Sequence, residues 1–189
     1  MIFLARMPAI LAYPAIIFTL LASLSLLLWT AFTGVPPQSS SKSEADAVIA
    51  LLKQAKLPDH AVIIDLGSGW GSLVIALARA FPQASVQGVE MSPFPYLISR
   101  FRTRTLSNVS LKRGNFFHSN LKNANAITCY LMPARMAQVS ELLDRTVKPG
   151  TCVVANAFQF RGRCVAASTQ GAWCGTVALY IWPARQWTG

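Results

Sequence analysis

The most informative segment of the chain reads Val62-Ile-Ile-Asp-Leu-Gly-Ser-Gly-Trp-Gly71. Its β-branched first half predicts a strand, and the apolar run at 72–78 directly after it predicts a helix. Three glycines lie between them, because a strand that turns sharply into a helix needs positive φ angles. The missing Cβ atoms also let a ligand lie against the backbone. The segment therefore predicts a strand, loop and helix that cradle a ligand of nucleotide size.

A carboxylate further along the chain strengthens this interpretation. Gly88-Val-Glu90 ends the next predicted strand, so Glu90 lies where it can accept hydrogen bonds from both hydroxyls of a ribose. The loop lacks the lysine of a P-loop, and its third glycine is too early for the dinucleotide fingerprint. S-adenosylmethionine has no pyrophosphate, so it fits this loop better than a dinucleotide or a nucleoside triphosphate does. A turn that merely joins strand to helix leaves Glu90 and Asp65 unexplained.

Strand-like and helix-like runs alternate after Pro58. Strands are predicted at 61–65, 85–90, 109–113, 126–131 and 151–158, and helices at 72–80, 95–105 and 134–146, after a first helix at 44–57 with Ser43 as its N-cap. This alternation predicts a parallel sheet with helices on both faces. Two last strands, at 163–168 and 176–182, have no helix between them and predict an antiparallel hairpin at the sheet edge.

These motifs resemble those of class I S-adenosylmethionine-dependent methyltransferases. The glycine loop matches their first motif, 109–117 is similar to the end of their third strand, and Lys148-Pro-Gly150 is similar to the turn before their fifth. The stretches 126–133 and 148–158 are also similar to a small branch with one N-terminal membrane segment, which includes mitochondrial lysine methyltransferases acting on the ATP synthase c-subunit and the adenine nucleotide translocase. The resemblance spans about 44–160 and implies a Rossmann-like, seven-stranded α/β fold with S-adenosylmethionine as cofactor.

The resemblance also implies which residues form the site. The residues expected around the methionine part of the cofactor are Asp65, Gly67, Ser68, Gly69 and Gly71. Glu90 is expected at the ribose, and Met91, Asn115 and Phe116 are expected around the adenine. Tyr130 and Asn156 are expected in the acceptor pocket, where the face of a tyrosine ring attracts an ammonium group. Core packing is the competing interpretation of Met91, Phe116 and Tyr130. Trp70 and Ala157 depart from the family pattern, which predicts altered substrate choice or reduced activity.

Composition excludes some classes of protein. With 53% hydrophobic residues and four cysteines, the chain is neither disordered nor a disulfide scaffold. The cysteines lack C-x-x-C spacing, so no metal site is predicted. The net charge is +10, and the densest basic cluster lies at 100–104 and 112–113. Contact with anionic lipid headgroups is the favoured interpretation of this cluster, over a solvated face and over nucleic acid, since Tyr130-Leu-Met-Pro133 is not the motif that holds a flipped base.

The N-terminal part lacks charge between Arg6 and Lys42, and 10–32 is almost wholly apolar. As a helix these residues would extend roughly 34 Å, against the ~30 Å core of a bilayer. We expect a membrane anchor at 1–33, a linker at 34–43 and a methyltransferase domain at 44–189. A cleaved signal peptide and a helix buried in a larger assembly are the alternatives. The anchor predicts a single-pass membrane protein, and unpaired thiols together with a cofactor kept in the cytosol predict that its catalytic domain faces the cytoplasm.

The sequence as a whole predicts a membrane-anchored methyltransferase that N-methylates a lysine of a membrane-associated protein. Methylation of a lipid or small molecule is one alternative, and a cofactor-binding protein without turnover is another. The oligomeric state is not predicted.

Overall fold

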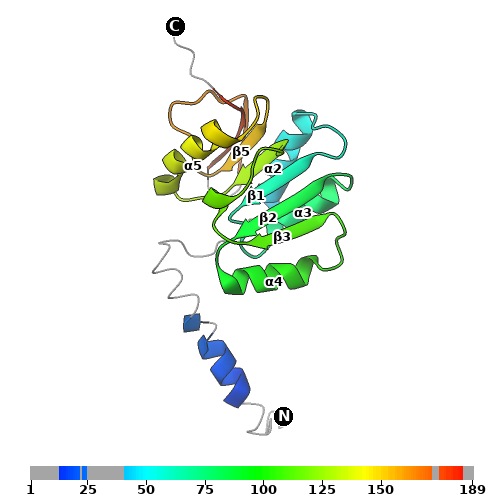
Figure 1. The fold of residues 1–189 in the computed structure, drawn as a ribbon, viewed down its shortest axis with the longest axis vertical. Helices are drawn as coiled ribbons and strands as arrows, with labels where there is room; N and C mark the ends of the chain where they lie inside the picture. Colours follow the sequence, from blue (N-terminus) through cyan, green and yellow to red (C-terminus); the bar gives the residue numbers. More distant parts are fainter. Residues whose placement is uncertain (1–12, 22, 25–40, 172–174, 185–189) are drawn as a thin grey trace. The chain divides into compact units, whose positions relative to one another are not determined.

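A computed structural model describes residues 13–21, 23–24, 41–171 and 175–184. The chain divides into two units, 1–37 and 38–189. In the second unit (Figure 1) the helices are α2 (Lys42–Gln54), α3 (Ser72–Ala80), α4 (Pro93–Thr103), the 3-10 helix η1 (Phe116–His118) and α5 (Pro133–Thr146). The strands are β1 (Val62–Leu66), β2 (Ser85–Glu90), β3 (Val109–Arg113), β4 (Ala126–Cys129), β5 (Cys152–Asn156), β6 (Ala167–Gln170) and β7 (Thr176–Ile181).

The strands form one sheet in the order β3-β2-β1-β4-β5-β7-β6. Strands β1 to β5 are parallel, and β7 is antiparallel to both β5 and β6. The prediction of a seven-stranded Rossmann-like sheet with an antiparallel C-terminal hairpin is therefore confirmed. The chain adds β2 and β3 on one side of β1 and then returns to place β4 on the other. Such a switch point creates a crevice outside the carboxyl ends of the strands, where α/β proteins bind their ligands.

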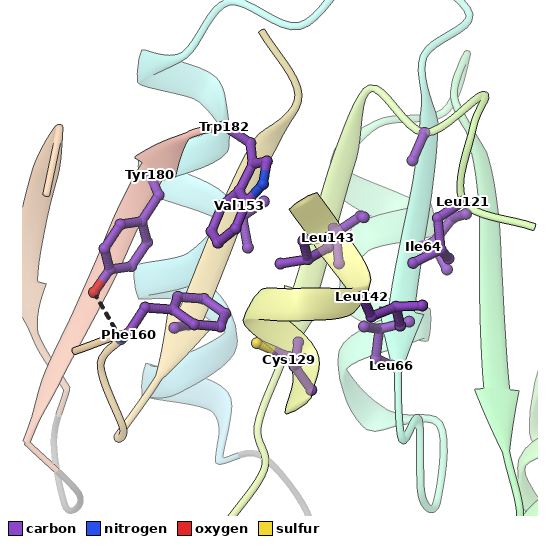
Figure 2. Packing of buried hydrophobic residues seen from close by; sticks show 14 of the residues in the cluster. Ile64, Leu66, Leu121, Cys129, Leu142, Leu143, Val153, Phe160, Tyr180 and Trp182 are labelled. Carbon is purple, nitrogen blue, oxygen red and sulfur yellow. Dashed lines mark hydrogen bonds between the residues drawn. The ribbon is translucent and has the colours of Figure 1, made fainter. Parts of the chain in front are cut away.

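Apolar side chains pack on both faces of the sheet. Successive residues of a strand point to opposite faces, so Ile63 joins the core under α2 and α3, and Ile64 joins the core under α5. Figure 2 shows the second core, in which Leu142 and Leu143 of α5 lie near Ile64 and Leu66. Burial on two faces explains why the parallel strands read as continuous apolar runs.

Several predicted boundaries need correction. The N-cap of α2 is Ser41 and not Ser43, because Ser41 and Glu44 bond each other's backbone in a capping box. Helix α4 begins two residues earlier than predicted, since Pro93 is accepted in the first turn. Strand β4 ends at Cys129, before the predicted 131. Strand β5 ends at Asn156 because Ala157 has a positive φ of 69°. Strand β6 begins at Ala167, four residues after the predicted start.

The predicted membrane anchor also needs correction. Residues 13–21 and 23–24 are helical, and the rest of 1–33 lies outside the described residues. Among the residues described, no helix has the length and apolar character to cross a membrane. For the part of the chain that the structure describes, the prediction of a single-pass membrane protein with a cytoplasmic catalytic domain is therefore wrong.

Candidate functional site

The glycine loop follows β1 at the carboxyl edge of the sheet. Gly67, Gly69 and Gly71 have φ angles of 78°, 51° and 78°, the left-handed values that the sequence predicts for this turn. A Cβ on Gly67 would lie 3.2 Å from Leu131 Cδ2, and one on Gly71 would lie 2.8 Å from Ser99 Cβ. Close packing therefore excludes a side chain at Gly71, whereas at Gly67 Leu131 would have to shift and the positive φ would strain any other residue.

The backbone N–H groups of the loop are used within the protein. Gly67 and Ser68 both donate to the carbonyl of Val89, at 2.9 and 3.0 Å, and Gly71 donates to that of Ser68 at 2.9 Å. Gly69 donates to Oε2 of Glu90 at 2.8 Å. A pyrophosphate needs free amides pointing at its oxygens. The four bonds thus favour a ligand without a pyrophosphate, in agreement with the loop spacing.

Glu90 ends β2 beside this loop. It is 8% exposed, and its Oε1 accepts a hydrogen bond from the N–H of Ser92 at 2.7 Å, while Oε2 accepts from Gly69. The two bonds fix the carboxylate in one orientation. Since a carboxylate has about four acceptor positions, roughly two remain for a ligand. This arrangement fits the predicted role of Glu90 as acceptor for two ribose hydroxyls.

Asp65 is the other carboxylate of the site and is 3% exposed. The hydroxyl of Thr128, its register partner on β4, donates to Oδ1 of Asp65 at 2.7 Å. Burial raises the pKa of Asp65 to about 7 from its usual 3.8, with the charge of Glu90 adding to the rise and the Thr128 bond opposing it. A positively charged ligand would favour ionisation of this carboxyl. The pair of carboxylates therefore fits a cationic nucleoside such as a sulfonium.

The remaining predicted cofactor residues lie around the same edge. The Ser68 hydroxyl is buried and has no hydrogen-bond partner among the described residues. Met91 is 37% exposed. Gly114 N–H donates to the Glu90 carbonyl at 2.9 Å, which places the end of β3 beside that of β2. Asn115 caps η1 by accepting from Phe117 N–H at 3.0 Å, so its side-chain oxygen is already in use. Phe116 is half-buried against the core under α5.

The two predicted acceptor residues lie at the ends of neighbouring strands, Tyr130 directly after β4 and Asn156 as the last residue of β5. Cys129 of β4 is the register partner of Ala155 of β5, so Tyr130 and Asn156, the next residue of the chain in each case, lie at the same sheet edge. Asn156 is 3% exposed, and its Nδ2 has no hydrogen-bond partner within the described part of the chain. Tyr130 is half-buried. The structure thus brings both residues to the edge that also carries the glycine loop.

Two contributors were missed from the sequence. Arg102 of α4, read there only as part of a basic cluster, donates through Nη1 to the Trp70 carbonyl at 2.6 Å and to Ser72 Oγ at 3.3 Å. The Trp70 ring also meets that of Phe94 edge-on at 5.8 Å, so α4 holds the loop at two points. Thr128 is the second, and its signal was a hydroxyl within an otherwise apolar strand.

Comparisons with known proteins agree with this geometry. A protein-family model, the ANTKMT methyltransferase domain, matches residues 65–166. A protein-lysine N-methyltransferase of Saccharolobus islandicus (strain REY15A) is 28% identical over 137 residues, which are 69% of this chain and 85% of that protein. The fold is similar to that of an RNA methyltransferase from Salinibacter ruber in complex with S-adenosyl-L-homocysteine, with a TM-score of 0.68, 25% identity, and coverage of 76% of this chain and 93% of that one. It is also similar to a SAM-dependent methyltransferase from Geobacter sulfurreducens in complex with the same molecule, with a TM-score of 0.51, 23% identity, and coverage of 61% and 48%.

Proposed function

Because the chain belongs to the family of ANTKMT methyltransferase domains, we propose that it methylates a lysine side chain of a protein. It is an S-adenosylmethionine-dependent methyltransferase, and S-adenosylmethionine is its cofactor. The observation that carries the choice of lysine is the similarity to a protein-lysine N-methyltransferase over 85% of that protein's length. The acceptor is therefore a primary amine on a protein surface.

In this proposal the cofactor residues divide into three groups. Glu90 uses its remaining acceptor positions for the ribose hydroxyls. Asp65 faces the positively charged methionine part, in a loop whose members are Gly67, Ser68, Gly69 and Gly71. Met91, Asn115 and Phe116 line the adenine, with Asn115 contributing its Nδ2 or the second lone pair of its oxygen. The cofactor supplies a methyl group on a sulfonium, which is already a good leaving group.

The chain contributes alignment of the amine rather than a strong base. A lysine must lose a proton and approach the methyl group in line, so orientation controls the rate. Tyr130 offers a ring face to the ammonium form and a hydroxyl to the neutral amine. Asn156 has a buried Nδ2 donor without a partner among the described residues, and this donor can bond a carbonyl oxygen of the substrate segment, since the lone pair of the amine must stay free to attack the methyl group. Solvent takes the proton.

RNA is a second candidate acceptor. The Salinibacter ruber neighbour is an RNA methyltransferase, and this chain covers 93% of it at 25% identity. A net charge of +10 also suits a polyanion. Methylation of a lipid or a small molecule, or cofactor binding without turnover, remain for the same experiment to decide.

The test uses purified protein and cofactor labelled in its methyl group. They are incubated separately with total protein, total RNA and a lipid extract, all prepared from the cells that make this protein. We expect label in the protein fraction that is recovered as methyl-lysine after acid hydrolysis. Label only in RNA or only in the solvent-extracted fraction would replace the lysine proposal. Cofactor binding with no transfer to any fraction would indicate a protein without turnover.

Glu90→Ala tests the cofactor site in the same experiment. Because hydrogen bonds to charged groups contribute about 1.5 to 3 kcal/mol, the substitution should weaken cofactor binding by about that amount or more and abolish labelling. Isothermal titration calorimetry measures the binding. An unchanged affinity in the folded variant contradicts the role given to Glu90.

A further inference from the structure

A groove of about 840 Å³ lies between the first half of α5 and the loop at 157–163 that follows β5. Met136 and Ala137 of the helix and Phe158 and Phe160 of the loop give it apolar walls. Preformed grooves with apolar walls and a few polar groups are the usual form of binding sites. Nothing in the cofactor site described above accounts for this groove.

The walls of the groove are held in place by the core. The N–H of Phe160 donates to the Tyr180 hydroxyl at 3.2 Å, and the Phe160 ring meets those of Tyr180 and Trp182 edge-on at 5.2 and 5.4 Å (Figure 2). Arg163 forms an ion pair with Asp144 of α5. The loop is therefore fastened both to the sheet and to the helix, so the groove needs little rearrangement to bind a ligand.

On the side of the loop, the lining of the groove begins at Ala157, the residue that directly follows Asn156 in the chain. Phe158 N–H donates to the Asn156 carbonyl at 2.9 Å across Ala157, whose φ of 69° makes this a three-residue turn in a strained conformation. Ala157 itself lines the groove. The chain thus passes in one step from the buried Asn156 to the groove wall. A polypeptide lying in the groove could deliver a side chain to Asn156.

The groove is positively charged. Its lining includes Arg161 and Arg163 and no acidic residue. Asp144 neutralises Arg163, whereas Arg161 is exposed and has no hydrogen bond or ion pair within the described part of the chain. The first turn of α5 contains Arg135 and no acidic side chain. Because the N-terminal end of a helix itself favours anions, this end of the groove is positive as well. A segment that carries a lysine would be repelled here unless acidic neighbours offset its charge.

We propose that this groove binds the segment of the substrate protein that carries the target lysine, and that Arg161 selects segments with an acidic residue close to that lysine. The inference rests on the proposed lysine methylation and deepens it. The lysine side chain enters beside Asn156, the backbone lies along the apolar walls, and a carboxylate of the segment pairs with Arg161.

The test compares peptides of equal length that contain one lysine and, at each position up to four residues away in turn, either glutamate or glutamine. We expect one glutamate position to raise kcat/KM about fivefold or more over the glutamine peptide. Arg161→Glu should remove or reverse that preference and leave cofactor affinity unchanged. Arg79→Glu makes the same change in charge on α3, which packs on the opposite face of the sheet, and should keep the preference.

Binding of fluorescent peptides, measured by anisotropy, repeats the comparison without turnover. Equal values for glutamate and glutamine peptides at every position, or a preference that survives Arg161→Glu, would overturn the inference while lysine methylation stands. A single-stranded oligonucleotide that binds more tightly than the acidic peptide, and is weakened by Arg161→Glu, would assign the groove to RNA and overturn it too. Absence of methyl-lysine with all peptides and with total protein would remove the proposed function itself and the inference with it.

Discussion

Asp65 links the stability of the fold to its function at the scale of a single residue. Its folded-state pKa is raised to about 7 from 3.8, so the stability that its protonated form contributes is present below about pH 4 and lost as pH rises through 7. Asp65→Asn removes the buried charge and keeps an oxygen for the Thr128 hydroxyl. At 1.36 kcal/mol per pKa unit, we expect a gain in the free energy of unfolding on the order of 2 to 4 kcal/mol at pH 8.

Thermal unfolding without cofactor at pH 5 and pH 8 checks this expectation. The difference between variant and wild type should grow with pH. A difference that is the same at both values would show that burial of the Asp65 carboxyl is not its cause.

Cofactor affinity should also depend on pH through Asp65. A sulfonium ligand favours the ionised carboxylate, so binding below pH 7 must release a proton. We expect the Kd of the wild type to rise by up to about tenfold for each pH unit below 7 and to level off above pH 8. Calorimetry at pH 6, 7 and 8 measures this, and Asp65→Asn, which should bind more weakly with a flatter profile, corrects for titration of the cofactor. A wild-type profile parallel to that of the variant contradicts the assignment.

Sequence spacing located Asp65 and Glu90 at one edge of the sheet, but it could not predict their partners. The Thr128 bond joins residues 63 positions apart and depends on the register between β1 and β4. The Glu90 bond to Gly69 depends on how the loop returns toward β2. Patterns in a sequence predict which strand end carries a side chain, whereas partners depend on packing between distant segments.

At the scale of elements, prediction succeeded where local signals agree. The helix at 72–80 and the strands at 85–90 and 109–113 have the predicted bounds, because periodicity and flanking turn residues mark the same ends. The end of β5 was predicted wrongly, since an alanine in the sequence does not indicate the positive φ that Ala157 has. The start of β6 was predicted wrongly because Arg163 bonds Asp144 and the Pro183 carbonyl. A strand pattern in the sequence cannot reveal such contacts.

Helix α4 fixes the glycine loop through Arg102, and this contact can be tested separately from folding. Arg102→Gln removes the bond to the Trp70 carbonyl, which as a charged hydrogen bond contributes about 1.5 to 3 kcal/mol. Because Arg102 is exposed, solvent offsets part of this energy, and we expect a change in Tm of only a few degrees. Because the glycine loop is then held less firmly, we expect a rise of about tenfold in the Kd for cofactor.

Arg100→Gln is the matched control, since Arg100 is exposed on the same helix and its side chain makes no hydrogen bond in the described part of the chain. It should bind the cofactor as the wild type does. Equal affinities of the two variants would mean that the loop keeps its conformation without Arg102.

For the molecule as a whole, alternating strands and helices predicted the layered fold, whereas mean hydropathy misled at the N-terminus. Composition reports how apolar 10–32 is on average. A membrane span needs an apolar helix of about 20 residues, and none of the helices in the described ranges meets that requirement. The length of a helix is a property of the folded chain, so a count of apolar residues could not establish it.

The boundary of the methyltransferase domain gives the last prediction. The first buried apolar residue of the two cores is Ala45, in the core under α2 and α3, and α2 begins with its own capping box at Ser41. A chain of residues 41–189 should therefore fold and bind cofactor as the full chain does. A chain of residues 44–189 keeps the same core but lacks Ser41, and loss of such a cap costs about 1 kcal/mol. We expect its Tm to be about 2 to 4 °C lower than that of 41–189, with the same cofactor affinity. Equal Tm values would show that the capping box does not stabilise α2, and failure of 41–189 to bind cofactor would place part of the domain before Ser41.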